Sequence, residues 1–210
     1  MQKLCIFLVY IVFVVFVPIV AHASSTTILT QTLNPGSVSM DIVDALYESV
    51  VSPVVAMGTK TAGSGCQSVS ETLGTPTQQI YGINSESGVS WNINLVASAV
   101  TDLWTSSTGT IDYNDPAGDG CTGGQMTVNP SVATLTKGQC ASCGTGGLTL
   151  GTAASFSQGV TDSITILSGE IGPGDTGDWK LTGVAISQKI PANKPAGNYV
   201  IKMVLTITAI

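Results

Sequence analysis

The feature that most constrains the fold is a strict alternation of side chains at the C-terminal end of the chain. Between residues 199 and 208, one parity carries bulky apolar side chains and the other carries mostly polar or β-branched ones. The first set is Tyr199, Ile201, Met203, Leu205 and Ile207, and the second is Val200, Lys202, Val204, Thr206 and Thr208. Because successive side chains of a strand point to opposite faces of a sheet, this pattern predicts a half-buried strand.

A second alternating run, from Trp179 to Ile186, precedes the first. The segment between them, Ile190–Gly197, contains two prolines and a glycine, which favour a loop over a continuous helix. The end of the chain therefore predicts two strands of an antiparallel sheet, joined by a loop.

Shorter segments with strand character recur upstream, separated by turn signals, and no long amphipathic helix interrupts them. Thr59–Thr75, which is rich in glycine and hydroxyl side chains, is expected to be a loop. The chain as a whole predicts about nine to eleven strands and an all-β fold, a single-domain antiparallel β-sandwich of Greek-key, jelly-roll or immunoglobulin-like type. The predicted upstream strands are Thr27–Leu33, Ser37–Val43, Pro53–Met57, Pro76–Ile83, Gly88–Ala97, Gln125–Val128, Val132–Thr136 and Ser163–Leu167.

The N-terminal segment has the pattern of a secretory signal peptide. Lys3 is followed by a long apolar run that ends in Ala21-His22-Ala23, so cleavage after Ala23 is expected. The alternative is a retained membrane anchor, because the apolar run approaches the roughly 20 residues that a spanning helix needs. With cleavage, residues 1–23 are removed and residues 24–210 form the β-sandwich domain of a secreted, extracellular protein.

Charge and composition exclude several classes of partner. The formal net charge is −6, all seven basic residues are lysines, and there is no arginine. Nucleic-acid binding needs a basic surface and commonly uses arginine, so no nucleic-acid partner is expected. The same acidity argues against anionic lipid, and we expect no membrane association once the signal is removed.

The only histidine, His22, lies in the predicted signal peptide. A mature chain without imidazole lacks the base of Ser-His-Asp and Cys-His catalysis and a usual ligand of catalytic zinc. Glycoside hydrolysis by paired carboxylates remains open, but no pattern places two carboxylates on facing strands. We therefore expect a protein that is not an enzyme.

Four cysteines remain after the signal: Cys66, Cys121, Cys140 and Cys143. An even number in an exported chain predicts disulfides. We expect Cys121 to pair with Cys140 or Cys143, closing a loop of about twenty residues, and Cys66 to take the remaining partner. The alternatives are a thioredoxin-like Cys-x-x-Cys redox pair at residues 140–143 and a zinc site built from all four thiolates.

An acidic loop offers a candidate site for a calcium ion. Asp112, Asn114, Asp115 and Asp119 place carboxylate and amide oxygens close together in the sequence, and such oxygens are the ligands that calcium prefers. The spacing does not fit an EF-hand, and Asp and Asn also populate turns for local reasons. Calcium is thus a possible ligand, and no other cofactor is expected.

Two tryptophan-containing segments resemble the WxL-type surface domains of bacteria. Trp91-Asn92-Ile93 lies in a predicted strand, and Trp179-Lys180-Leu181 is a literal Trp-x-Leu. The last strand is similar to the final strand of that family, with Met203-Val204-Leu205 in the place of the second Trp-x-Leu. The resemblance implies a β-sandwich that binds the cell wall non-covalently. The wall-binding candidates are Trp91, Trp104, Trp179 and Leu181.

The sequence also resembles camelysin-like secreted fibre proteins, in which the N-terminal strand of one subunit completes the sandwich of the next. Two functions follow as expectations. The first is an adhesive or structural module that binds a cell-wall polymer or another surface protein. The second is a filament subunit that self-associates by lending Ser24–Leu33 to a neighbour, although that segment also fits an edge strand of its own sheet.

Overall fold

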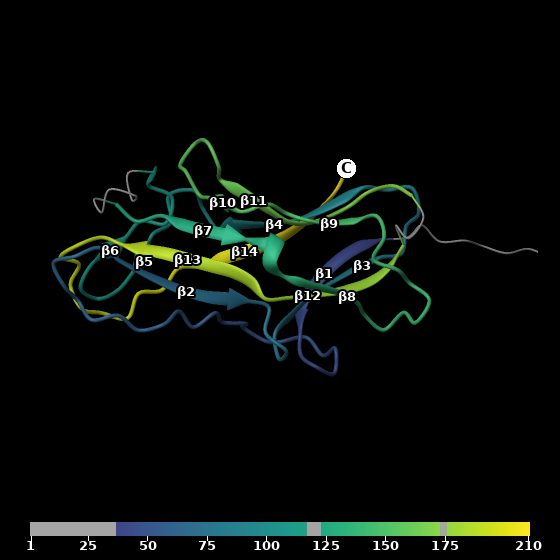
Figure 1. Cartoon of the computed structure of the whole chain (residues 1–210), viewed down its shortest axis with the longest axis horizontal. Coiled ribbons are helices and arrows are strands. Elements are labelled where there is room, and N and C mark those ends of the chain that lie inside the picture. The colour runs from purple at the N-terminus through teal and green to yellow at the C-terminus, as the bar shows by residue number, and fades with distance from the viewer. Residues whose placement is uncertain (1–36, 117–122, 173–175) are drawn as a thin grey trace, which may run out of the picture. The chain divides into compact units, whose positions relative to one another are not determined.

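The computed structural model describes residues 37–116, 123–172 and 176–210, and these belong to one compact unit that spans Pro35–Ile210. The predicted signal peptide, the predicted strand Thr27–Leu33, Cys121 and Asp119 lie outside the described residues. In Figure 1 the regular elements of the described part are all strands, apart from one short helical turn. The prediction of an all-β, antiparallel, sandwich-like fold is confirmed.

The described residues form fourteen strands and one short 3₁₀ turn, η2 (Pro130–Val132). Three of the strands are two residues long, which accounts for part of the excess over the predicted number. The strands are β1 (Val38–Val43), β2 (Gln67–Leu73), β3 (Gln79–Asn84), β4 (Trp91–Ala97), β5 (Trp104–Thr105), β6 (Thr110–Ile111), β7 (Met126–Asn129), β8 (Thr134–Lys137), β9 (Leu148–Leu150), β10 (Ala154–Ser155), β11 (Ser163–Gly169), β12 (Gly177–Thr182), β13 (Val184–Ile190) and β14 (Met203–Ala209).

Three four-stranded antiparallel sheets and one small hairpin make up the fold. Their strand orders are β1-β3-β12-β8, β10-β7-β13-β2, β14-β4-β11-β9 and β5-β6. β12 passes into β13 through the single residue Gly183, whose φ of 81° suits glycine, and so the chain moves directly from the first sheet into the second.

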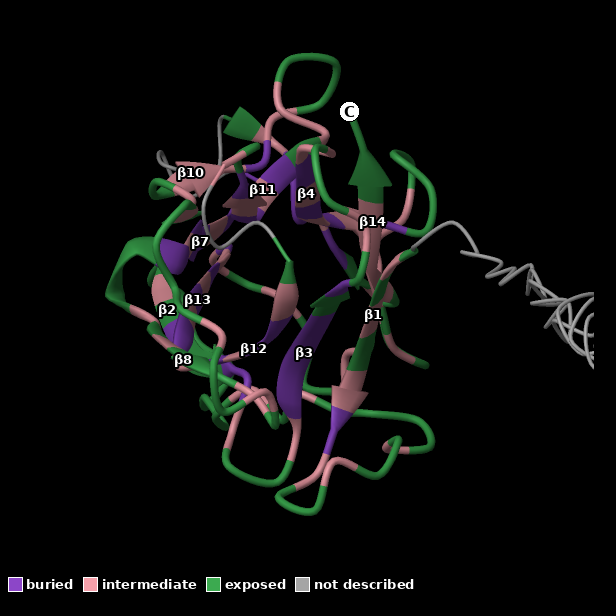
Figure 2. Ribbon diagram, turned by 90° about the vertical axis from the view of Figure 1, so that its right-hand side faces the viewer, coloured by how far each residue is buried: buried purple, intermediate pink, exposed green. Residues whose placement is uncertain are grey.

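The apolar faces of the three larger sheets share one core (Figure 2). β4 contributes Trp91, Ile93 and Leu95, which alternate with half-buried residues as its sequence predicts. In β11 a bulge between Thr165 and Leu167 lets both Ile166 and Leu167 face the core. Burial of apolar side chains from all three sheets is the main source of stability in such a fold.

The strands at the C-terminal end of the chain have the predicted alternation, but they do not pair with one another. Ile201, Met203, Leu205 and Ile207 pack against the core from one face, as expected. β14, however, pairs with β4, while β12 and β13 belong to the other two sheets. The alternating run 179–186 is thus two strands, broken at Gly183.

Two local predictions are wrong. Pro53–Met57 is not a strand, and the expected loop Thr59–Thr75 contains β2. β2 is an edge strand of its sheet and buries only Val69 and Leu73, so its sequence carries little of the apolar alternation that marks a strand.

Candidate functional site

Two adjoining cavities lie beside the β5–β6 hairpin, and both are lined by Trp104 and Tyr199. The first, which we call the Trp104 groove, has a volume of about 440 Å³. Its walls are the segment 57–63 and the segment 190–199, and residues of β2, β6 and β13 complete its lining. The second, the apolar cavity, has a volume of about 600 Å³ and reaches core residues Leu95, Met126 and Ile186.

Backbone pairing places Trp104 beside Tyr199. Thr105 and Val200 exchange two main-chain hydrogen bonds of 2.9 Å, which join the β5–β6 hairpin to the segment before β14. The hairpin turn adds a contact of its own, because Thr108 Oγ1 donates to the Ala196 carbonyl at 2.8 Å. As a result, two aromatic residues that are 95 positions apart line the same groove.

A buried amide orients the Trp104 ring. Gln188, on β13, is only 3% exposed, and its Oε1 accepts a hydrogen bond of 2.9 Å from Trp104 Nε1. Its Nε2 donates to the carbonyls of Asp112 and Lys189 at 2.9 and 2.8 Å. Because these bonds fix the amide, the half-buried indole is held in one orientation at the wall of the groove.

The other tryptophans form part of the core. Trp91 and Trp179 are 0% and 1% exposed, and their rings stack with centroids 5.6 Å apart. Leu181 is equally buried. A side chain without exposed surface cannot touch a polymer, so the wall-contact role expected for these three residues is wrong. Of the four candidates, Trp104 is the one that lines these two cavities.

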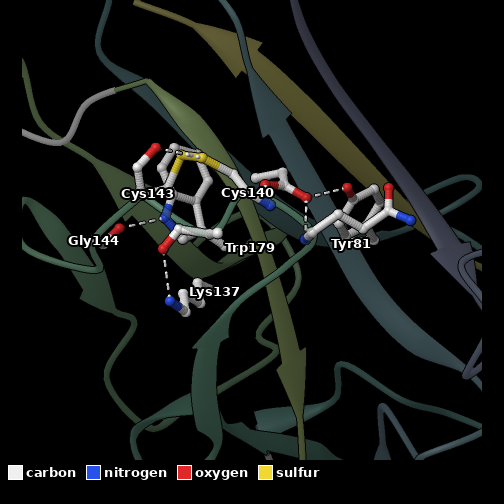
Figure 3. Close-up of a disulfide and its surroundings, with 10 residues drawn as sticks. Tyr81, Lys137, Cys140, Cys143, Gly144 and Trp179 are labelled. Atoms are coloured by element: carbon white, nitrogen blue, oxygen red, sulfur yellow. Dashed lines mark hydrogen bonds between the residues drawn. A yellow bond between two sulfur atoms is a disulfide. The ribbon is translucent and has the colours of Figure 1, made fainter.

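The predicted disulfide pairing is also wrong, because Cys140 and Cys143 bond to each other. Cys66 is disulfide-bonded as well, and Cys121 lies outside the described residues. The bond closes a tight loop between β8 and β9 (Figure 3). Pairing within this loop also contradicts a zinc site of four thiolates, since a disulfide sulfur carries no thiolate charge.

Hydrogen bonds to Asp178, at the start of β12, hold the disulfide loop in place. The Asp178 carboxylate accepts hydrogen bonds from Tyr81 Oη, from Gln139 N at 2.6 Å and from Cys140 N at 2.8 Å. Trp179 Nε1 donates to the Gly144 carbonyl at 2.7 Å, and Lys137 Nζ donates to the carbonyl of Ala141 at 2.8 Å (Figure 3).

Asp178 is only 7% exposed, and burial by itself raises the pKa of its carboxyl. The hydrogen bonds from Tyr81, Gln139 and Cys140 together outweigh burial, so the pKa lies below its usual value. Burial and the bond to Asp178 raise the pKa of the Tyr81 phenol.

This surrounding favours a structural disulfide over a redox-active one. The side-chain ligand atoms of Cys140, Cys143 and Asp178 all lie within 4.8 Å of one another. A thiolate formed there would face the negative charge of Asp178, whereas redox-active pairs stabilise their thiolate with a helix N-terminus or a cation.

The acidic loop is only partly described. Asp112 Oδ1 accepts a hydrogen bond of 2.9 Å from Asn114 N, and Asn114 Nδ2 donates to the carbonyl of Val100 at 3.0 Å. These are turn-stabilising contacts. Asp115 is described, Asp119 is not, and the described residues of this loop do not converge into a metal-ligating group. Calcium binding stays a prediction.

Sequence reasoning identified Trp104 but missed the residues that build its groove. The sequence pattern could have indicated Gln188, because this polar residue lies on the same face of β13 as the buried residues Val184 and Ile186. Tyr199 and the segment 57–63 offered none, because only the tertiary pairing brings them to Trp104.

No helix among the described residues is long and apolar enough to cross a membrane. Comparisons of the chain with family models, with curated proteins and with solved structures found no match. The resemblance to WxL-type and camelysin-like domains therefore stays a prediction from short motifs.

Proposed function

We propose that this chain is a secreted, non-catalytic protein of the cell surface that associates with a cell-wall polymer through the Trp104 groove. The observation that carries the proposal is Trp104 itself, a half-buried indole held by the buried Gln188 and lining an open groove. An aromatic face beside amide and hydroxyl groups suits a saccharide, whose rings present apolar C–H faces and polar edges.

Two further observations support an extracellular, non-catalytic role. The disulfide between Cys140 and Cys143 fits an oxidising compartment. None of the described residues that line the groove is a histidine, an aspartate or a glutamate, so the groove lacks the side chains that most often act as general bases.

Co-sedimentation with purified cell walls tests the proposal. Trp104→Ala is expected to weaken binding about tenfold or more, as truncation of an aromatic anchor does. The matched control is Tyr47→Ala, which removes a half-buried aromatic that lines neither cavity. Tyr199→Ala provides a second groove variant in case Trp104→Ala unfolds. Equal binding by all folded variants, or no binding by the native protein, would contradict the proposal.

A second candidate function is that of a filament subunit, and one observation favours it. β14 is an edge strand, and none of the described strands pairs with its outer side. β1 approaches β14 without hydrogen bonding to it. An unpaired edge is a template for an added strand, and Ser24–Leu33 of another copy is the proposed donor.

Electron microscopy of secreted material tests this candidate. A filament subunit gives fibres that disappear when Ser24–Leu33 is deleted after the signal. A protein that stays monomeric by light scattering, with or without that segment, contradicts filament formation and leaves wall binding in place.

A further inference from the structure

We infer that the polymer bound in the Trp104 groove is anionic, a glycan or polyol chain with carboxylate or phosphate groups along its length. This inference rests on the proposed function and adds the charge of the ligand. Its basis is the distribution of charged residues around the groove.

The charged residues that line the groove are all lysines. Lys60 lies on one wall, in the segment 57–63, and Lys194 lies on the other, in the segment 190–199. None of the described aspartates and glutamates lines the groove, although the chain carries thirteen acidic residues against seven lysines. The groove is thus a locally positive site on an acidic protein, and a cleft lined by one sign of charge attracts the opposite sign.

The two ammonium groups are available to a ligand. Lys194 Nζ donates a hydrogen bond of 2.9 Å to the carbonyl of Thr110, which positions the ammonium at the rim without neutralising its charge. Lys60 is exposed, and neither lysine forms an ion pair with a described residue. A main-chain hydrogen bond joins the two walls, in which Asn193 N donates to the carbonyl of Gly63 at 2.9 Å.

The adjoining apolar cavity contributes less charge. Lys202 is its one charged lining residue among those described. The Asp102 carboxyl lies close enough to Lys202 for the lysine to help lower its pKa, after the larger effects of hydrogen bonds from Ser98 and Ala99. Asp102 therefore offsets part of the Lys202 charge, and we assign anion contact to Lys60 and Lys194.

The net charge of −6 favours a single polymer strand over an anionic membrane surface as the ligand. A flat anionic bilayer would lie against the groove and also against the rest of the protein, whose net negative charge would repel it. A single polymer strand enters the groove and meets the lysines at contact distance, while repulsion from charges beyond about 8 Å is screened at physiological salt. A polymer is therefore the fitting occupant.

Isothermal titration of the full secreted chain at physiological salt tests the inference. The probes are polygalacturonate for carboxylate, poly(glycerol phosphate) for phosphate, and dextran as a neutral chain. The native protein is expected to bind at least one anionic probe about tenfold more tightly than dextran. The preferred probe shows which anionic group is recognised.

The decisive variant is Lys60→Gln/Lys194→Gln, which is expected to lose about tenfold in affinity for the anionic probe. Its matched control is Lys137→Gln/Lys180→Gln, in which two lysines that line neither cavity lose their charge. Each double variant also loses one hydrogen bond from a lysine to a carbonyl, that of Lys137 in the control and that of Lys194 in the decisive variant. The control is expected to bind within about twofold of the native protein, since charges outside the site contribute little at this ionic strength. Circular dichroism verifies that each variant is folded.

Equal affinity for dextran and both anionic probes, or an unchanged affinity in the folded Lys60→Gln/Lys194→Gln protein, overturns the inference. If Trp104→Ala still abolishes binding in that case, the proposed function survives with a neutral ligand. If none of the probes and no purified wall binds the native protein, both the inference and the proposed function are overturned.

Discussion

The carboxylate of Asp178 holds the disulfide loop through charge-assisted hydrogen bonds. Three donors, Tyr81 Oη, Gln139 N and Cys140 N, converge on one buried group. Hydrogen bonds to a charged group contribute about 1.5–3 kcal/mol each, and a buried donor left without a partner is costly. Replacing the charge should therefore affect stability more than a surface substitution does.

Asp178→Asn is expected to lower the free energy of unfolding by about 1–3 kcal/mol at neutral pH. The pKa of Asp178 is lowered in the folded state, so its contribution is present above the unfolded pKa of about 3.9 and is lost as the pH falls through the folded value. Urea unfolding at neutral pH and at about pH 2 should show a difference between native and variant protein that narrows in acid. A difference that is constant or grows in acid would contradict this assignment.

Gly169 allows the Trp91 indole to pack closely against β11. The two residues are directly paired, and a Cβ at position 169 would lie 2.3 Å from Trp91 Cε2. Gly169→Ala is expected to cost about 1–3 kcal/mol of stability by overpacking the core. Gly146→Ala, whose Cβ would meet nothing within 4 Å, is the control and should change stability little. Chemical denaturation of both variants provides the comparison, and equal stability would refute the close packing.

The Cys140–Cys143 disulfide closes a short loop in the connection between β8 and β9. Its bond spans only three positions, so it restricts the unfolded chain less than a long-range disulfide would. Cys140→Ser/Cys143→Ser is expected to lower the unfolding free energy by at most about 2 kcal/mol and to leave polymer binding unchanged. Thermal unfolding and wall co-sedimentation measure the two effects, and loss of binding in the folded variant would show that the loop takes part in recognition.

The elements that the sequence predicts well are those that bury one regular face. β4 alternates in burial over all seven of its residues, and β14 packs Met203, Leu205 and Ile207 against the core, as the sequence pattern predicts. β2 was missed because an edge strand pairs on one side only and its polar side chains resemble those of a loop. The break at Gly183 was missed because the alternation on either side of it gives no sign that the strand changes sheet.

The candidate site was harder to predict than the strands. Trp104 stood out as the one tryptophan outside a regular alternation, but its partners depend on pairing across the fold. The Thr105–Val200 bridge and the Trp104–Gln188 hydrogen bond join positions far apart in the sequence. The Cys140–Cys143 pair entered the sequence analysis only as the redox alternative to the expected pairing, because four cysteines permit three pairings and residue spacing does not choose among them.

At the scale of the whole described molecule, one core serves three sheets, and the groove lies beside it. Trp91 and Trp179 stack in that core, whereas Trp104 lines the open groove. The three tryptophans therefore divide into two that solvent does not reach and one that it does. This division makes the intrinsic fluorescence a reporter of the groove, because a collisional quencher acts on the exposed indole.

Acrylamide quenching of tryptophan fluorescence, with and without purified cell-wall polymer, tests polymer binding in the groove most directly. The polymer is expected to reduce quenching of the native protein, because it covers Trp104, the one tryptophan whose indole is partly exposed. In Trp104→Phe, whose remaining tryptophans are 0% and 1% exposed, quenching should be low and unaffected by the polymer. Unchanged quenching of the native protein at saturating polymer would contradict the account.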